Sequence, residues 1–148
     1  MNIKNVTSII TKTEQTLTAL PLRLISGLIF SAHGTQKLFS WFGGYGLEGT
    51  GQFMASLGLE PGYLMALLAG SAEFFGGLAL VIGLLVRPAS AVIAFTMVMA
   101  IFSVHISNGL FMANNGYEYA LTLLIVAMSL VFSGAGALSV DKALSSKH

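Results

Sequence analysis

The residues best suited to chemistry in this sequence are ionisable side chains inside long apolar segments: His33, Lys37, Glu73 and His105. An ionisable group in hydrocarbon costs a few kcal/mol or more, so we expect these side chains to face other protein or a wet cavity. Carboxylates and imidazoles exchange protons during catalysis, and an ammonium group donates hydrogen bonds. We therefore predict that Glu73, His33 and His105 are catalytic and that Lys37 binds substrate.

Four further residues are predicted to complete a substrate pocket beside these groups. They lie at the ends of the apolar segments and carry polar or aromatic side chains: Trp41, Asn108, Tyr117 and Glu118. Trp41 and Tyr117 also fit an aromatic belt at a membrane surface. Glu118, three residues after Asn115, also fits a capping box at a helix start. The sequence leaves these alternatives open.

A purely structural role is the main alternative for the charged groups. Glu73 could form an ion pair with Lys37, or a hydrogen bond to His33, that simply holds two helices together. Either imidazole could be an interior histidine with satisfied hydrogen bonds. Di-iron sites in helix bundles use Glu-x-x-His pairs, which no segment here contains. We predict no metal site, with a single metal ion or a haem held by His33 and His105 as an alternative.

Composition places the chain among membrane proteins. Of its 148 residues, 55% are hydrophobic and only 9% are charged, whereas a soluble domain has about a quarter charged residues. Its seven basic residues are scattered, so we expect no nucleic-acid binding. The absence of cysteine excludes thiol chemistry and thiolate metal sites. The partner implied by composition is the lipid bilayer.

The elements that must position the candidate residues are four apolar segments, and we predict that each crosses the membrane as a helix. Their expected bounds are 20–40, 63–86, 89–110 and 117–135. A glycine-rich turn after the first leads into a short interfacial helix, Thr50 to Leu57. The predicted fold is therefore an all-α integral membrane bundle of four transmembrane helices that forms a single domain over 1–148.

Helical periodicity predicts which faces of the segments meet. His33 and Lys37 lie about 40° apart around a helix. Glu73 shares a face with the small residues Ala66, Gly70 and Gly77, which allow close approach of a neighbouring helix. In the last segment one face is shared by Glu118, Thr122, Ile125 and Ser129. We expect Arg23 to extend towards headgroups and the segment after Ser133 to end in water.

The distribution of basic residues predicts the orientation. Lys4, Lys12, Arg87, Lys142 and Lys147 fall on one side of the predicted bundle, with only Lys37 near the other. By the positive-inside rule both termini are cytoplasmic and the chain is a multi-pass protein. His33, Lys37, His105 and Glu118 then lie in the outer half, with Glu73 near the midplane.

Several motifs together resemble the DoxX family of bacterial and archaeal membrane proteins: GLIFSAHGTQKL, LAGSAEFFGGLALVIGLLVRPAS, VHISNG, GYEYAL and GAGALSVD. The resemblance covers about Leu20 to Lys142. It implies a four-helix protein of the bacterial inner membrane, associated with quinone-linked oxidoreduction. The matching motif positions are His33, Lys37, Glu73, His105 and Glu118, without settled roles.

We therefore expect a membrane oxidoreductase subunit that binds a quinone or similar small redox molecule in the outer half. Because no nucleotide, flavin or haem motif is present, soluble redox enzymes are expected partners. The alternatives are a non-enzymatic anchor for such partners and a small-solute carrier. A carrier would require a homo-oligomer, since four helices alone form a thin wall.

Overall fold

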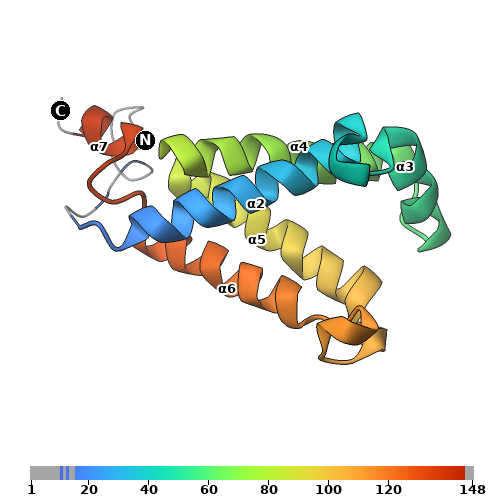
Figure 1. Cartoon of the computed structure of the whole chain (residues 1–148). Helices are drawn as coiled ribbons and strands as arrows, with labels where there is room; N and C mark the ends of the chain where they lie inside the picture. The colour runs from blue at the N-terminus through green and yellow to red at the C-terminus, as the bar shows by residue number, and fades with distance from the viewer. Residues whose placement is uncertain (1–10, 12, 14–15, 146–148) are drawn as a thin grey trace, which may run out of the picture.

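The computed structural model describes residues 11, 13 and 16–145, which form helices and turns without a strand (Figure 1). The long helices are α2 (Ala19–Phe39), α4 (Gly62–Ile82), α5 (Val86–Ala100) and α6 (Glu118–Ser133). The short helix α3 (Gly46–Ser56) lies at one end of the molecule and α7 (Val140–Ser145) at the other. The predicted all-helical class is confirmed.

Short irregular turns complete the architecture. Three are 3-10 turns, at Trp41–Gly43, Ile106–Asn108 and Met112–Asn114, and one π-helical turn, Ile101–His105, continues α5. The predicted interfacial helix exists as α3, but it begins at Gly46 rather than Thr50.

The predicted boundary between the second and third apolar segments is wrong by a few residues. α4 ends at Ile82 because Gly83 and Leu85 both adopt left-handed backbone conformations, with φ of 73° and 49°. α5 then begins at Val86, before Pro88. A proline in the first turn costs nothing, since its missing N–H would have no partner within the helix.

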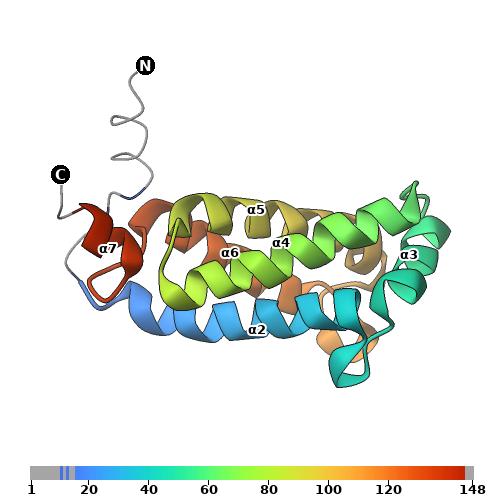
Figure 2. The same cartoon turned by 90° about the horizontal axis from the view of Figure 1, so that it is seen from above.

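The closest packing in the bundle joins α2 to α4. The predicted small face of α4 is buried against α2, with Ala66, Gly70 and Gly77 all inaccessible. A Cβ added to Gly77 would lie 2.6 Å from the Gly27 carbonyl oxygen of α2, so the two backbones are in contact there. Figure 2 shows α4 between α2 and α5, and α6 closes the bundle against α5 and α2.

The separation between the α2–α4 pair and the α5–α6 pair changes along the bundle. In Figure 1 the α2–α4 pair and the α5–α6 pair diverge towards the end where α3 lies. The apolar core fills the opposite part of the bundle, where Phe30, Leu80, Ile93 and Leu130 are fully buried. Cavities occupy the diverging end, so the fold leaves room where the candidate residues lie.

Two helical segments are long and apolar enough to cross a membrane: α4 and the continuous helical stretch Val86–Asn108. In the most apolar 18-residue stretch of each segment, only 28% and 22% is buried inside the protein. Most of their apolar surface therefore points outwards. A soluble core helix would be largely buried, whereas outward apolar surface suits lipid or another chain. α6 is apolar with 16 residues, and α2 carries Arg23, His33 and Lys37. Four membrane crossings remain a prediction.

The end of the bundle opposite α3 contains a buried polar cluster that the sequence did not predict. Arg23 is 2% exposed and donates to the Leu138 carbonyl oxygen, so it does not extend to headgroups. Asp141 is 1% exposed and accepts from the backbone N–H groups of Leu85 (2.7 Å) and Val86 (3.0 Å). The expectation that the segment after Ser133 ends in water is therefore wrong for Gly134, Ala135, Gly136 and Asp141, which are buried.

Candidate functional site

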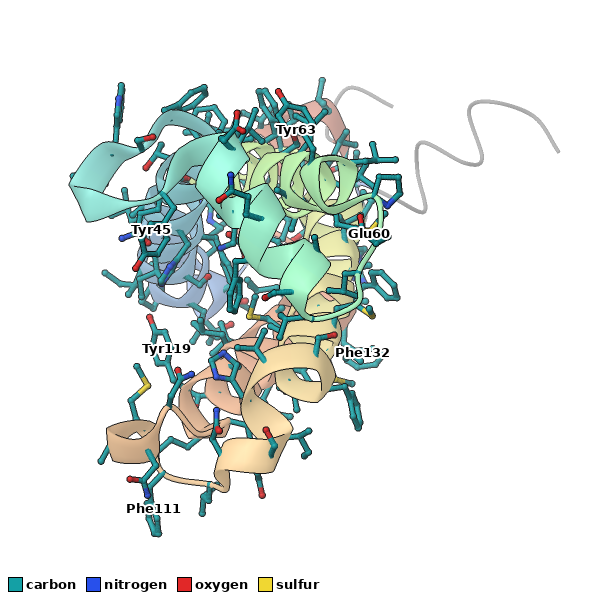
Figure 3. All side chains as sticks on the ribbon, turned by 90° about the vertical axis from the view of Figure 1, so that its right-hand side faces the viewer. Tyr45, Glu60, Tyr63, Phe111, Tyr119 and Phe132 are labelled. Carbon is teal, nitrogen blue, oxygen red and sulfur yellow. The ribbon has the colours of Figure 1, made fainter. Side chains whose placement is uncertain are left out.

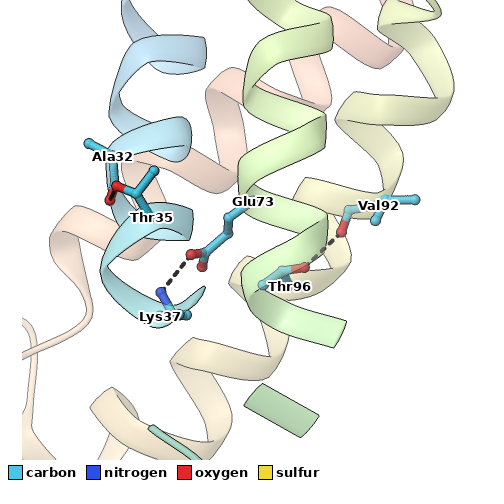
Figure 4. A network of polar contacts seen from close by, with 6 residues as sticks. All are labelled: Ala32, Thr35, Lys37, Glu73, Val92 and Thr96. Carbon is cyan, nitrogen blue, oxygen red and sulfur yellow. Dashed lines mark hydrogen bonds and ion pairs between the residues drawn. The ribbon is translucent and has the colours of Figure 1, made fainter. Parts of the chain in front are cut away.

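An ion pair between α2 and α4 is the centre of the candidate site. Lys37 Nζ lies 2.5 Å from Glu73 Oε2 (Figure 4). The Glu73 side chain is 4% exposed and that of Lys37 is 25% exposed, so the ammonium group reaches towards solvent while the carboxylate is inside the bundle. Glu73 Oε1 makes no hydrogen bond within the described residues. One carboxylate oxygen is thus free for a ligand.

Both predicted histidines join this ion pair around one cavity. A space of about 120 Å³ between the helix pairs is lined by His33, Lys37, Glu73 and His105. Its remaining walls are apolar or aromatic and come from α2, α5 and α6: Phe30, Met97, Ala100, Tyr119, Ala120 and Leu123. The structure thus brings the three predicted catalytic residues and Lys37 together from α2, α4 and the continuation of α5.

The π-helical turn of residues 101–105 positions His105. Within it the N–H of Ile106 bonds to the carbonyl of Ile101, five residues earlier, which adds a residue to that turn. His105 Nδ1 lies 2.8 Å from the Asn115 carbonyl oxygen in the loop before α6. A carbonyl only accepts, so Nδ1 carries the proton. In a neutral ring Nε2 is then the acceptor.

A second, larger cavity begins at the same polar residues. It has a volume of about 220 Å³, lies between α3, α4 and α5, and also includes Lys37, Glu73 and His105 in its lining. On the other side of Lys37 an open groove of about 560 Å³ runs past Gln36 and Tyr45. Lys37 therefore lies where an outer groove and two inner cavities meet.

The four remaining predicted residues do not line either inner cavity. Trp41 is 60% exposed and packs against Phe39. Asn108 donates to the carbonyls of Val104 and Asn115. Tyr117 packs against the apolar core. These three residues therefore shape the end of the bundle rather than the cavity.

Glu118 holds the loop that precedes α6. Its Oε1 accepts from the backbone N–H of Met112 at 2.6 Å. α6 begins at Glu118 itself, so the capping box with Asn115 does not form. The face of Thr122, Ile125 and Ser129 is exposed; the buried face of α6 is Ala120, Leu123, Ala127 and Leu130.

Tyr119 is a cavity residue that the sequence interpretation missed. Its ring lies 6.4 Å from the His33 ring, centroid to centroid. Figure 3, viewed from the α3 end, shows Tyr119 between the helices above and the α5–α6 loop below, where Phe111 lies. Its spacing could have identified it, because Tyr119 precedes the buried Leu123 by one helical turn and so lies on the same face of α6.

The arrangement suits proton exchange with a small polar ligand in an apolar site. Lys37 donates hydrogen bonds, while Glu73 Oε1 and a neutral His105 accept them. Among the described residues, no three His, Cys, Asp or Glu side chains are grouped so that they could hold a metal ion. The geometry therefore offers hydrogen-bonding and acid–base groups.

Comparison with known proteins gives a consistent result. A family model described as DoxX matches residues 18–106, which include His33, Lys37, Glu73 and His105. "Putative oxidoreductase CatD" of Bacillus subtilis is 35% identical over 122 residues, covering 82% of this chain and 83% of that protein. "Inner membrane protein YqjF" of Escherichia coli is 31% identical over 134 residues, covering 86% and 92%. No solved structure matches the chain significantly.

Proposed function

Because this chain belongs to the DoxX family, as its motifs suggested, we propose that it is a membrane subunit that binds a quinone-type redox carrier. The observation that carries the proposal is the cavity in which Lys37, Glu73, His33 and His105 converge within an apolar bundle. The relatives' names, an oxidoreductase and an inner membrane protein, support the class of function and the bacterial inner membrane as its location.

Each polar group has a role in this proposal. A quinone carbonyl oxygen accepts a hydrogen bond from Lys37 Nζ, and the flat ring lies among the apolar walls near Tyr119. On reduction the quinone takes up two electrons and two protons and becomes a hydroquinone. The two protons come from water in the groove beside Lys37. Glu73 Oε1 and His105 Nε2 relay them to the quinone oxygens and then accept hydrogen bonds from the new hydroxyl groups. Glu73 and His105 thus remain proposed catalytic residues, and so does His33, whose ring lines the smaller cavity beside Tyr119 and can exchange a proton there.

The electrons must come from outside this chain in the proposal. The sequence has no cysteine and no flavin, nucleotide or haem motif that would carry them. A soluble redox enzyme at the membrane surface is the donor or acceptor we propose. The exposed aromatic side chains of Trp41, Phe42 and Tyr45 are a surface at the α3 end against which such a partner could pack.

The test is binding of a quinone to the purified protein in lipid nanodiscs. Glu73→Gln and His105→Ala are expected to weaken binding about ten-fold or more, since each removes a charged or hydrogen-bonding group from a water-poor site. Glu48→Gln is the matched control, because it makes the same change at an exposed carboxylate of α3 outside both inner cavities. Equal affinity in all three variants would refute the proposal.

A non-enzymatic anchor is the second candidate, and the ion pair favours it. Lys37 and Glu73 directly join α2 and α4, which is the clamp considered from the sequence. If that is their whole purpose, Glu73→Gln lowers the melting temperature and leaves quinone affinity unchanged. Recovery of partner proteins together with the wild-type chain, with no quinone bound, would favour the anchor.

A further inference from the structure

The larger inner cavity has two chemically different ends. Lys37, Glu73 and His105 form its polar end. The rest of the lining is mainly apolar and comes from α3, the turn after it, and α5 opposite: Phe53, Met54, Leu57, Leu59, Met99 and Val104. The side chains of Thr50, Thr96 and Ser103 add three hydroxyl groups to it. A ligand that fills this cavity therefore meets charge at one end and hydrocarbon at the other.

The cavity is too small to enclose a long molecule. Its volume is about 220 Å³, whereas sites that surround a whole drug-sized ligand have about 300 Å³ or more. The smaller cavity adds about 120 Å³ and shares Lys37, Glu73, Ala100 and His105 with it. Together they can hold a substituted ring, so any long tail on that ring must leave the protein.

The apolar end opens on the outside of the bundle between α3 and α5. α3 packs mainly on α4 and α2, so its contact with α5 is slight. Leu57 is 36% exposed and Met99 is 39% exposed, so residues on both sides of the opening reach the exterior. Phe95 and Phe102 extend the same apolar surface along α5 and its continuation. This opening faces the side that suits lipid.

We propose that the ligand is a membrane-resident amphiphile, a redox-active ring with a long hydrocarbon tail, which enters from the lipid through the α3–α5 opening. The inference rests on the proposed function and names the class of quinone it takes. The ring reaches Lys37, Glu73 and His105, while the tail lies between Leu57 and Met99 and continues into the bilayer. The groove beside Gln36 and Tyr45 then serves water and protons rather than the ligand.

The first test compares two probes that have the same dimethoxy-methyl-benzoquinone head. One probe has no tail and the other has a decyl tail. Binding is measured in nanodiscs and corrected for partition into empty discs. The tailed probe is expected to bind about ten-fold more tightly, because a few methylene groups are buried at the opening. Leu57→Asp should abolish this difference, because it places a charge where the tail is buried.

Ser56→Asp is the matched control, since it adds the same charge one residue away at an exposed position outside the cavity. It should leave both affinities unchanged. Equal binding of the two probes, insensitive to Leu57→Asp, would overturn the lateral route while the proposed function stands. Failure of the wild type to bind either probe would overturn the proposed function, and this inference with it.

A second measurement uses only the wild-type chain and so does not depend on how variants fold. A probe with a photoreactive diazirine at the end of the tail is irradiated in the nanodisc, and the labelled peptides are identified by mass spectrometry. Adducts at Phe53, Leu57 or Met99 are expected. Adducts confined to Gln36, Tyr45 or their neighbours would show entry from the aqueous groove and would overturn the proposal.

Discussion

At the scale of single residues, the Lys37–Glu73 pair is unequal in a way that predicts unequal mutants. The Glu73 side chain is 4% exposed and that of Lys37 is 25% exposed. Lys37→Met leaves a buried carboxylate unpaired and should destabilise the protein by about 3 kcal/mol. Glu73→Gln leaves an ammonium group that can reach water, and should cost about 1 kcal/mol. Thermal unfolding of both variants in one detergent provides the measurement.

The Lys142→Met variant controls for loss of a positive charge, because Lys142 lies at the other end of the molecule, on α7. It should unfold close to the wild-type temperature. If Glu73→Gln lowers the unfolding temperature as much as Lys37→Met does, the loss of stability comes from the missing ion pair itself. It would then not come from leaving a buried carboxylate unpaired.

His105 gives a second residue-level prediction, about its protonated nitrogen. The 2.8 Å contact with the Asn115 carbonyl requires the proton on Nδ1. Nitrogen NMR of the imidazole-labelled protein should therefore find the Nδ1–H tautomer in the neutral ring, with Nε2 available to a ligand. His33 is the internal reference, because its hydrogen bond is with the Gln36 side chain and no backbone carbonyl contact of its ring is found among the described residues. A proton on Nε2 of neutral His105 would contradict the role proposed for that nitrogen.

At the scale of elements, the α2–α4 contact depends on paired glycines. A Cβ on Gly77 would lie 2.6 Å from the Gly27 carbonyl oxygen and from the Ser31 backbone nitrogen, which a folded protein does not tolerate. Gly77→Ala should force the helices apart and cost about 1–3 kcal/mol. Thermal unfolding and quinone affinity should both decline, since the cavity residues Lys37 and Glu73 lie on these two helices.

The adjacent Gly76→Ala variant is the control for the change of residue type. Its Cβ would lie 3.0 Å from the Cγ1 and Cδ1 atoms of the Ile93 side chain, on the side facing α5, and its nearest backbone contact there would be the Ala89 carbonyl oxygen at 3.8 Å. We expect a much smaller loss of stability than for Gly77→Ala. Equal losses would mean that helix propensity or local backbone effects, rather than the α2–α4 contact, set the stability.

The start of α5 depends on a carboxylate far away in the sequence. Asp141 accepts from the first backbone N–H groups of α5, at Leu85 and Val86, and is 1% exposed. Asp141→Asn keeps the shape and removes the charge, so it should cost about 1–2 kcal/mol. Quinone affinity should stay unchanged, because this cluster is at the opposite end from the cavity. A loss of affinity without a loss of stability would contradict this separation.

At the scale of the whole molecule, the features that could be predicted from the sequence are those determined by residues close together in the chain. Apolar runs and periodicity were enough to find α2, α4, α5 and α6, and the small face around Glu73 was found because its spacing is local. The π-helical turn was missed, since no local pattern requires it. Arg23 and Asp141 were missed because their partners, Leu138 and Leu85, are 115 and 56 residues distant.

The candidate site was predicted in the same uneven way. Ionisable residues in apolar segments have few ways to be satisfied, so the convergence of His33, Lys37, Glu73 and His105 followed from the cost of burying them. Tyr119 is neither charged nor unusual near a helix start, so its type gave no signal. Glu118 has the charge but faces the loop, where its carboxylate accepts a hydrogen bond from the Met112 backbone N–H.

The number of membrane crossings is the property of the whole chain on which the proposed site depends. By length and composition, α4 and residues 86–108 qualify as spans, whereas the proposed cavity also needs α2 and α6 within the bilayer. The two arrangements differ in the position of α7. With four crossings, Ala143 and Ser107 lie on opposite sides of the membrane, as the contact of Asp141 with the start of α5 requires. If α6 does not cross, they lie on the same side and that contact cannot form.

The absence of cysteine allows a direct measurement of this difference. Single variants Ser107→Cys and Ala143→Cys, both exposed, are treated in intact spheroplasts with a membrane-impermeant maleimide. Because basic residues collect on the cytoplasmic side, Ser107→Cys should be labelled at once and Ala143→Cys only after the membrane is permeabilised. Immediate labelling of both positions would leave α6 outside the bilayer core. The cavity would then face water, and a lipid-borne ligand could not reach Glu73 by the route between α3 and α5.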